Sequence, residues 1–293
     1  YEPGLYLVKL SSGYNIGIKK EDVVKIERVK EKKKSYPSAL KSKGNKKEKK
    51  KNLPKVDLII TGGTISSRLD PETGAVKWLT KPEELFRFYP EMFDIVNVRK
   101  VKVPFMKASE NMDYKDWQII AKEVVESLNE DEVEGVIVTH GTDFLHYTSA
   151  ALSFFLRDLN KPVVLTYSQR SIDRASSDAR LNLICSAKAA ISNIAEVMLV
   201  GHGSINDDFC YAMLGTKVRK LHTSRRDAFQ PINTEPIAKI WPEKDKPIEI
   251  INQNYRKRAN KRKVKLDAKF NENIALIKFY PGQKPDFLDK KYD

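Results

Sequence analysis

Thr61-Gly62-Gly63-Thr64-Ile65 directly follows an apolar, strand-like run at residues 56–60, and His140-Gly141-Thr142-Asp143 follows a second such run at residues 135–138. In open α/β sheets, ligands collect at the carboxyl ends of the strands, where the following loops converge. Each string places a threonine hydroxyl there, beside glycine, which lets the backbone approach a ligand closely. Two hydroxyls and a carboxylate in one crevice suit acyl transfer, with a nucleophile, a proton carrier and a substrate anchor.

Strand-like runs and amphipathic helices alternate from residue 55 onward, which predicts a doubly wound, mostly parallel α/β sheet over residues 55–270. Asp113 precedes the strongest helical pattern, in which apolar residues recur on one face over residues 117–128. Further helices are expected from the capping box at Thr80 to about Pro90, over residues 148–159 and over residues 177–195, and further strands over residues 163–166 and 197–200.

The first 54 residues have a different composition. Residues 1–30 predict a small all-β domain, with strands at residues 5–10, 14–18 and 23–29. Residues 31–54 are rich in lysine, contain Pro37 and lack apolar periodicity, which is typical of a flexible linker.

The two opening strings, in this order, resemble those of the asparaginase-like amidohydrolases. Matching segments between and after them extend the resemblance to the end of the chain: Ser109-Glu110-Asn111-Met112, Gln169-Arg170-Ser171 and residues 218–227. Within that family the sequence is most similar to the glutaminase subunits of archaeal tRNA-dependent amidotransferases, on residues 147–154, Ser176-Ser177-Asp178 and the additional N-terminal segment.

The resemblance also implies a smaller C-terminal domain. Its first strand would lie at residues 274–282, so residues 271–293 would be only the start of that domain. Relatives continue for a whole domain beyond this point. We therefore expect the small C-terminal domain to be largely absent from this chain.

The resemblance implies catalytic roles for four residues. Thr64 would attack the side-chain amide carbon of the substrate, release ammonia and leave an acyl-enzyme ester for water to hydrolyse. Thr142, Asp143 and Lys220 would handle protons. A lysine acts as a base only where burial or a neighbouring cation lowers its pKa.

Substrate binding follows from the charges of free glutamine. Asp143 and Glu110 suit its α-ammonium group, and Ser109 with loop amides suits its α-carboxylate. Many family members carry Gln where Glu110 stands. The chain lacks two groups that relatives use, a lid tyrosine between Thr64 and Tyr89 and a carboxylate of the C-terminal domain, so the group that activates Thr64 stays open.

The net charge of +14 is concentrated in two places. Residues 41–51 hold seven lysines and one glutamate, and residues 255–265 hold seven lysines or arginines and no acid. Two interpretations explain this pattern. The two stretches are a solvated linker and a surface loop, or they contact an RNA backbone. No metal is expected, because metal-ligand spacing is absent from Cys185, Cys210 and the four histidines. No apolar run approaches the roughly 18 residues of a membrane helix, so we expect a cytoplasmic protein.

The expected binding partners are implied only by the resemblance to the amidotransferase glutaminase subunits. It implies that the chain hydrolyses glutamine without a cofactor, while a synthetase-like partner subunit uses ATP and Mg²⁺ to activate Glu-tRNA(Gln). It also implies a self-dimer within a heterotetramer. A free-standing L-asparaginase and a catalytically silent RNA-binding or scaffold protein remain alternatives. A nucleotide-binding loop is excluded, because neither GxxxxGK[ST] nor GxGxxG occurs.

Overall fold

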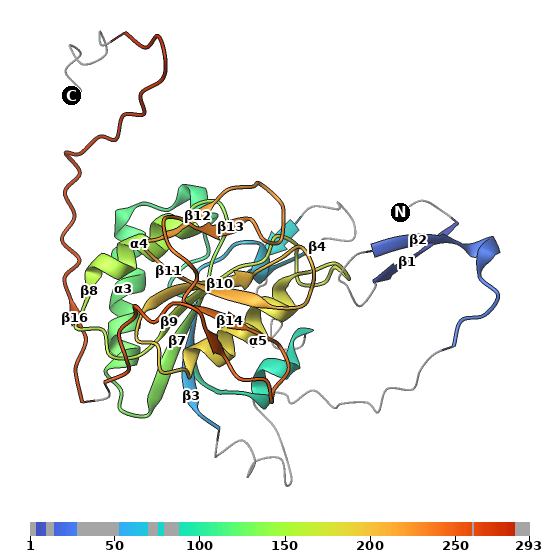
Figure 1. Ribbon diagram of the computed structural model, residues 1–293, viewed down its shortest axis with the longest axis horizontal. Helices are drawn as coiled ribbons and strands as arrows, with labels where there is room; N and C mark the ends of the chain where they lie inside the picture. The colour runs from blue at the N-terminus through green and yellow to red at the C-terminus, as the bar shows by residue number, and fades with distance from the viewer. Residues whose placement is uncertain are drawn as a thin grey trace.

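The computed structural model describes residues 4–9, 15–27, 53–69, 76–78, 88–259 and 261–284. Its centre is an eight-stranded sheet in the order β15-β14-β11-β10-β9-β7-β3-β6 (Figure 1). Five neighbouring strands are parallel, namely β6 (Asn97–Lys102), β3 (Lys55–Ile60), β7 (Val133–Thr139), β9 (Val163–Thr166) and β10 (Val197–His202). Three antiparallel strands extend the sheet beyond β10, namely β11 (Cys210–Leu214), β14 (Ala238–Ile240) and β15 (Glu249–Ile250). The predicted mostly parallel α/β fold is confirmed.

Helices cover both faces of this sheet, and each face has its own core. The helix α5 (Ala179–Ala190) and the 3₁₀ helix η3 (Pro90–Asp94) pack on one face, and α3 (Tyr114–Leu128) and α4 (Leu145–Phe155) pack on the other. Strand β3 contributes Leu58 to the first core and Ile59 to the second, as the two-residue period of a strand requires. An apolar run that is buried on both sides therefore forms this central strand.

The predicted first residues of the helices agree with the structure more closely than the predicted last residues do. Asp113 caps α3 by accepting hydrogen bonds from the N–H groups of Lys115 and Asp116, and the Asp116 carboxylate accepts in return from the Asp113 N–H. Helix α5 is shorter than predicted, because residues after Ala190 turn toward β10 and Ile194 forms a bridge with Lys257. The helix predicted from Thr80 lies almost entirely outside the described residues.

The N-terminal strands β1 (Leu5–Lys9) and β2 (Asn15–Lys19) pair in an antiparallel hairpin, as predicted, followed by the 3₁₀ turn η1 (Lys20–Asp22). The third predicted strand is wrong for its described part, residues 23–27. Val24 and Ile26 are exposed there, so they have no sheet face on which to pack. The predicted linker lies outside the described residues except for its last two positions.

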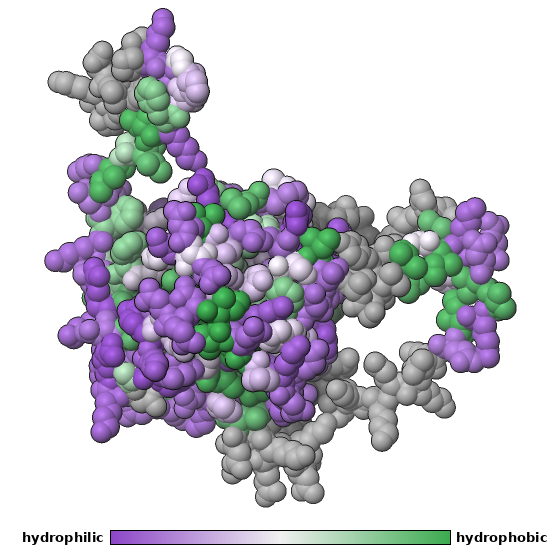
Figure 2. Space-filling view, in the orientation of Figure 1, coloured by the Kyte–Doolittle hydropathy of each residue, from purple (hydrophilic) through white to green (hydrophobic). Residues whose placement is uncertain are grey.

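The strand predicted at residues 274–282 is wrong as well. Residues 274–280 are extended without a strand partner in the part of the chain that the structure describes. Ile274 is 76% exposed and Leu276 is 84% exposed. Figure 2 shows hydrophobic residues along the C-terminal segment where it extends away from the body of the molecule. Alternating apolar residues favour an extended backbone, but a strand forms only where another backbone accepts its hydrogen bonds.

Short strand pairs complete the structure: β4 (Ser67–Leu69) with β5 (Val76–Trp78), β12 (Val218–Lys220) with β13 (Phe229–Pro231), and β8 (Leu156–Arg157) with β16 (Lys265–Leu266). No helix within the described ranges has the length and apolar character to cross a membrane.

The connection between β14 and β15 is held by a buried lysine. The Lys188 ammonium group, on α5, donates hydrogen bonds to the carbonyl oxygens of Trp241, Glu243 and Lys246 at 2.9, 2.8 and 2.7 Å. Burial lowers the pKa of Lys188. The three carbonyls satisfy all three of its donors and fix the connection against the helix.

Candidate active site

Glycines bring three loops into backbone contact at the carboxyl ends of β3, β7 and β6. A Cβ atom on Gly63 would lie 2.4 Å from the Gly141 Cα, and one on Gly141 would lie 2.9 Å from the Ser109 Oγ. A Cβ on Gly62 would lie 2.4 Å from the Lys107 carbonyl oxygen. Gly62 and Gly63 also have φ angles of +121° and +78°, which other residues rarely adopt. The glycines in the two strings are therefore required for the convergence of the loops.

Thr64 begins a short 3₁₀ turn, η2 (Thr64–Ser66), directly after these glycines. The turn is closed by its own groups: the Ser66 N–H donates to the Gly63 carbonyl at 3.0 Å, and the Ser67 hydroxyl donates to the Thr64 carbonyl at 2.7 Å. The Thr64 side chain is half-buried, and its hydroxyl has no hydrogen-bond partner among the described residues. The fold thus fixes the Thr64 backbone and leaves its hydroxyl available.

A lysine joins the second string from 78 residues further along the chain. The Lys220 ammonium group, at the end of β12, donates to the Thr142 Oγ1 at 2.8 Å and to the Asp143 Oδ1 at 2.7 Å. The side chains of Thr142 and Lys220 are buried, whereas that of Asp143 is 58% exposed. The structure therefore brings together the three residues predicted to handle protons, while their catalytic roles stay a prediction.

Ser109 and Glu110 follow β6 in the 3₁₀ turn η4 (Ser109–Asn111). Ser109 is fully buried, and its Oγ accepts a hydrogen bond from the Phe144 N–H at 3.2 Å, next to Asp143. Glu110 is exposed. The serine thus lies inside the junction of the loops and the glutamate on its surface, and their roles in substrate binding also stay a prediction.

His140 is a structural part of the site to which the motifs alone assign no role. Its Nδ1 lies 2.8 Å from the Gly141 carbonyl oxygen, and its Nε2 lies 2.9 Å from the Thr148 Oγ1. Burial lowers the pKa of His140 to about 4, so the ring is neutral at pH 7. Because a carbonyl only accepts, Nδ1 must donate and Nε2 must accept from the threonine. The ring ties the second string to α4.

A fourth loop, residues 167–172, follows β9 and reaches the first. The Ile172 N–H donates to the Ser67 carbonyl at 3.2 Å. The buried Asp178 carboxylate accepts from the N–H groups of Gln169 and Arg170, at 2.9 and 3.1 Å for the shortest contacts. Burial raises the pKa of Asp178. The backbone of this loop is therefore firmly held beside the turn that carries Thr64.

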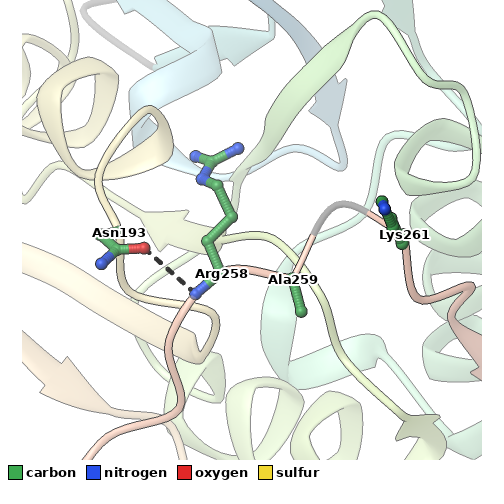
Figure 3. Close-up of a pocket in the computed structure, with 4 residues that line it drawn as sticks. All are labelled: Asn193, Arg258, Ala259 and Lys261. Atoms are coloured by element: carbon green, nitrogen blue, oxygen red, sulfur yellow. Dashed lines mark hydrogen bonds between the residues drawn. The ribbon is translucent and has the colours of Figure 1, made fainter.

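A surface hollow of about 380 Å³ lies elsewhere, lined by Asn193, Arg258, Ala259 and Lys261 (Figure 3). Asn193 precedes β10, so the hollow lies at the amino ends of the parallel strands, opposite Thr64. The Arg258 N–H donates to the Asn193 Oδ1 at 3.3 Å. This hollow is therefore separate from the candidate active site.

The hollow belongs to the basic run at residues 255–265, most of whose charge is compensated in the structure. Four of its cations form ion pairs with acidic side chains: Arg256 with Glu196, Arg258 with Glu134, Lys263 with Asp131 and Lys265 with Asp158. Lys257, Lys261 and Arg262 have no acidic partner within the described ranges. Also within these ranges, no group of three His, Cys, Asp or Glu side chains is arranged to hold a metal ion.

Comparison with known families agrees with the geometry. A family model described as "Asparaginase, N-terminal" matches residues 55–256. The chain therefore belongs to the asparaginase family, and the resemblance seen in its motifs is confirmed.

Curated relatives define the similarity more narrowly. A glutamyl-tRNA(Gln) amidotransferase subunit of Pyrococcus abyssi is 51% identical over 97% of this chain and 63% of the relative, and the corresponding subunit of Methanothermobacter thermautotrophicus is 43% identical over 96% and 62%. The chain thus spans less than two thirds of the length of these relatives. Among solved structures, the L-asparaginase of Thermococcus kodakarensis is similar with a TM-score of 0.65 and 29% identity, over 80% of this chain and 66% of that one.

Proposed function

We propose that this chain carries the glutaminase site of a tRNA-dependent amidotransferase. The observation that carries the proposal is the junction of loops that holds the available Thr64 hydroxyl, Ser109 and Thr142. Lys220, at the end of β12, joins it by hydrogen bonds to Thr142 and Asp143. The identity of 51% to a glutamyl-tRNA(Gln) amidotransferase polypeptide, against 29% to an asparaginase of known structure, favours glutamine over asparagine as the substrate.

Thr64 acts as the nucleophile in this proposal. Its Oγ loses a proton and bonds to the side-chain carbonyl carbon of glutamine, the C–N bond breaks, and the nitrogen leaves as ammonia with an added proton. Water then hydrolyses the ester, which releases glutamate and restores the Thr64 hydroxyl. Lys220 and Thr142 carry protons in both steps, and the Asp143 carboxylate keeps the lysine in position.

The rest of the pocket binds the charged groups of the substrate. Asp143 and Glu110 bind the α-ammonium group, and Ser109 with neighbouring loop N–H groups binds the α-carboxylate. No metal or cofactor has a part in these steps. The chain requires only glutamine and water.

The ammonia is consumed by another subunit. The relatives' name describes one subunit of a glutamyl-tRNA(Gln) amidotransferase, and we propose the same assembly here. A synthetase-like partner subunit uses ATP and Mg²⁺ to activate the glutamyl group of Glu-tRNA(Gln), which ammonia converts to Gln-tRNA(Gln). This chain also pairs with itself, giving a heterotetramer in the cytoplasm.

The decisive experiment measures ammonia release from glutamine and from asparagine by the full-length protein, with Thr64→Ala as the control. Each assay is run with and without the partner subunit and Glu-tRNA(Gln). Glutamine hydrolysis that rises with charged tRNA and disappears in Thr64→Ala is expected. Rapid asparagine hydrolysis without the partner would instead identify a free-standing asparaginase, which the solved structures favour as the second candidate. If neither substrate is hydrolysed under any condition, the remaining hypothesis is a catalytically silent RNA-binding or scaffold protein.

A further inference from the structure

A fully buried histidine at the carboxyl end of β10 has both ring nitrogens against hydrogen-bond acceptors. The His202 Nδ1 lies 2.7 Å from the Asn182 Oδ1, and its Nε2 lies 2.9 Å from an oxygen of the Asp207 carboxylate. The Asn182 Nδ2 donates to the Tyr167 carbonyl at 2.9 Å, so the amide oxygen must face the ring. A neutral imidazole has only one N–H, and two acceptors therefore require a proton on each nitrogen.

The charged neighbours of the ring favour this imidazolium form. Asp207 also lies 3.4 Å from a guanidinium nitrogen of Arg226, which favours the ionised acid. A second acid, Asp178, precedes α5. Burial raises the pKa of Asp178, and the His202 ring is close enough to oppose that shift. Two carboxyl groups thus offset the two cations, His202 and Arg226.

Two further titratable side chains contact the same network and are neutral at pH 7. Cys210 is the partner of His202 on β11, and its thiol donates to the Asn182 Oδ1 at 3.4 Å. Tyr167 lies in the loop after β9. Burial raises the pKa of both the Cys210 thiol and the Tyr167 hydroxyl. Neither group therefore adds a charge that would repel or replace the imidazolium.

Both ring nitrogens are connected to one residue, Arg226, in the turn between β12 and β13. On the Nδ1 side, Asn182 holds Tyr167, whose hydroxyl donates to the Arg226 carbonyl at 2.8 Å. On the Nε2 side, Asp207 pairs with the Arg226 guanidinium. His202 thus fixes the backbone of Arg226 through one nitrogen and its side chain through the other.

The hairpin that contains this turn also contains Lys220. Lys220 is the last residue of β12 and lies opposite Phe229 of β13. The Tyr167 ring contacts Phe229, with ring centroids 4.5 Å apart. The network around His202 therefore contacts the hairpin at its turn and at the residue opposite Lys220, which fixes the position from which the lysine reaches Thr142.

We infer that His202 is a buried imidazolium whose two hydrogen bonds hold the β12–β13 hairpin and so position Lys220 beside Thr142. This inference rests on the proposed glutaminase function, in which Lys220 carries protons. Because His202 acts through the hairpin and not on the substrate, it is a positioning residue.

The protonation state is tested by NMR of the full-length protein labelled with ¹⁵N-histidine, with the signals of His202 assigned by their loss in His202→Gln. At pH 8 an ordinary histidine ring in water is mostly neutral. We expect both ring nitrogens of His202 to carry a proton at this pH. Asp207→Asn should remove the proton from Nε2, because an amide can donate to that nitrogen whereas a carboxylate cannot. A single protonated nitrogen in the wild type would overturn the inference.

Positioning of Lys220 is tested by a double-mutant cycle on ammonia release, with the partner subunit present. His202→Gln is expected to lower kcat for glutamine by about tenfold, since a displaced proton carrier still functions in part. In a Lys220→Met background the same substitution should have no further effect, because the group that it positions is gone. Equal fold-losses in both backgrounds would show that His202 acts independently of Lys220. If His202→Gln does not fold, Asp207→Asn, whose side chain is 19% exposed, takes its place in the cycle.

Lys188→Met is the matched control. It also removes a cation that packs between α5 and other elements with every donor satisfied, but its three acceptors lie in the connection between β14 and β15. Both variants should lower the melting temperature, and only His202→Gln should lower kcat. Equal kcat values for the two variants would contradict the inference. If Thr64→Ala is inactive while His202→Gln keeps the wild-type kcat, only this inference fails; if Thr64→Ala stays active, the proposed function fails.

Discussion

Gly63 and Gly141 lie so close that a Cβ atom on Gly63 would come within 2.4 Å of the Gly141 Cα. The spacing between the loops that carry Thr64 and Thr142 is therefore set by two backbones with no side chain between them. The positive φ of Gly63, +78°, adds a second reason why no other residue fits.

Gly63→Ala is expected to lower kcat/KM for glutamine by about 100-fold, because a displacement of about 1 Å at a catalytic group has effects of that size. Steady-state ammonia release measures it. Gly17→Ala, in β2, is the control: its Cβ would meet only the Leu5 Cδ1 at 3.5 Å, an ordinary contact. Equal activity of Gly63→Ala and Gly17→Ala would show that the close contact is not needed.

Lys220→Met tests the proton-handling group. It removes the donor to Thr142 and Asp143 while preserving the length of the side chain. We expect kcat to fall by about 10² to 10⁴, the usual contribution of a proton carrier. Stability should change little, because an ion pair with the exposed Asp143 contributes at most about 1 kcal/mol. Lys217→Met, an exposed lysine just before β12, should keep full activity. A Lys220→Met protein as active as the control would refute the role of Lys220.

His140 predicts a dependence of stability on pH. Its pKa is about 4 in the folded protein and 6.5 in the unfolded chain, so between these values only the unfolded chain takes up the proton. The free energy of unfolding must therefore decrease as the pH falls from 6.5 to 4, by roughly 3 kcal/mol in total from this group.

Urea unfolding of the wild type and of His140→Gln, between pH 4 and pH 7, measures this contribution. The glutamine side chain does not titrate, so the variant should lose less stability over the range. Asp178 acts in the opposite direction, since its raised pKa favours the folded state at low pH, but it is common to both proteins. Parallel curves for the two proteins would contradict the assignment.

The basic run yields a prediction about RNA. Lys257, Lys261 and Arg262 are the cations of this run without an acidic partner among the described residues, so an RNA contact would depend on them. Replacing all three by glutamine should then reduce the slope of log K against log salt for tRNA binding by about one unit per lost phosphate contact. An unchanged slope would leave the run a surface feature of the fold.

Residues 41–51 are tested in the same way and independently. Their seven lysines, changed to neutral residues, should leave basal glutaminase activity intact. Because none of the proposed active-site residues lies in this segment, any RNA contact should affect only the salt dependence of tRNA binding. A fall in basal activity would instead connect this segment to the catalytic domain.

The sequence was most informative where one element determines its own structure. Strand β9 has the predicted bounds, since three of the four residues in Val163–Thr166 are β-branched and Pro162 precedes the run. Asp113 caps its helix because the side chain needs only neighbouring N–H groups. The positions of Thr64 and Thr142 after the carboxyl ends of strands followed from strand–loop order, whereas the adjacency of these two strands, β3 and β7, is a finding of the structure.

Local sequence patterns could not predict contacts between residues that are distant in the chain. No spacing rule relates Lys220 to Thr142 across 78 residues, and only family resemblance indicated the pair. The run at residues 255–265 suggested an uncompensated surface because its acidic partners, such as Glu196 and Glu134, lie elsewhere in the chain. The pairing of His202 with Asn182 and Asp207 depends on the packing of several elements, which no single segment encodes.

Lys188 extends from α5 to three backbone carbonyls in the connection between β14 and β15. Many proteins order such a carbonyl cluster with a metal ion taken from solution. Here the cation is covalently part of the helix. Chelators and changes in salt composition should therefore leave this edge of the sheet unaffected, and we expect its integrity not to vary with the ionic environment of the protein.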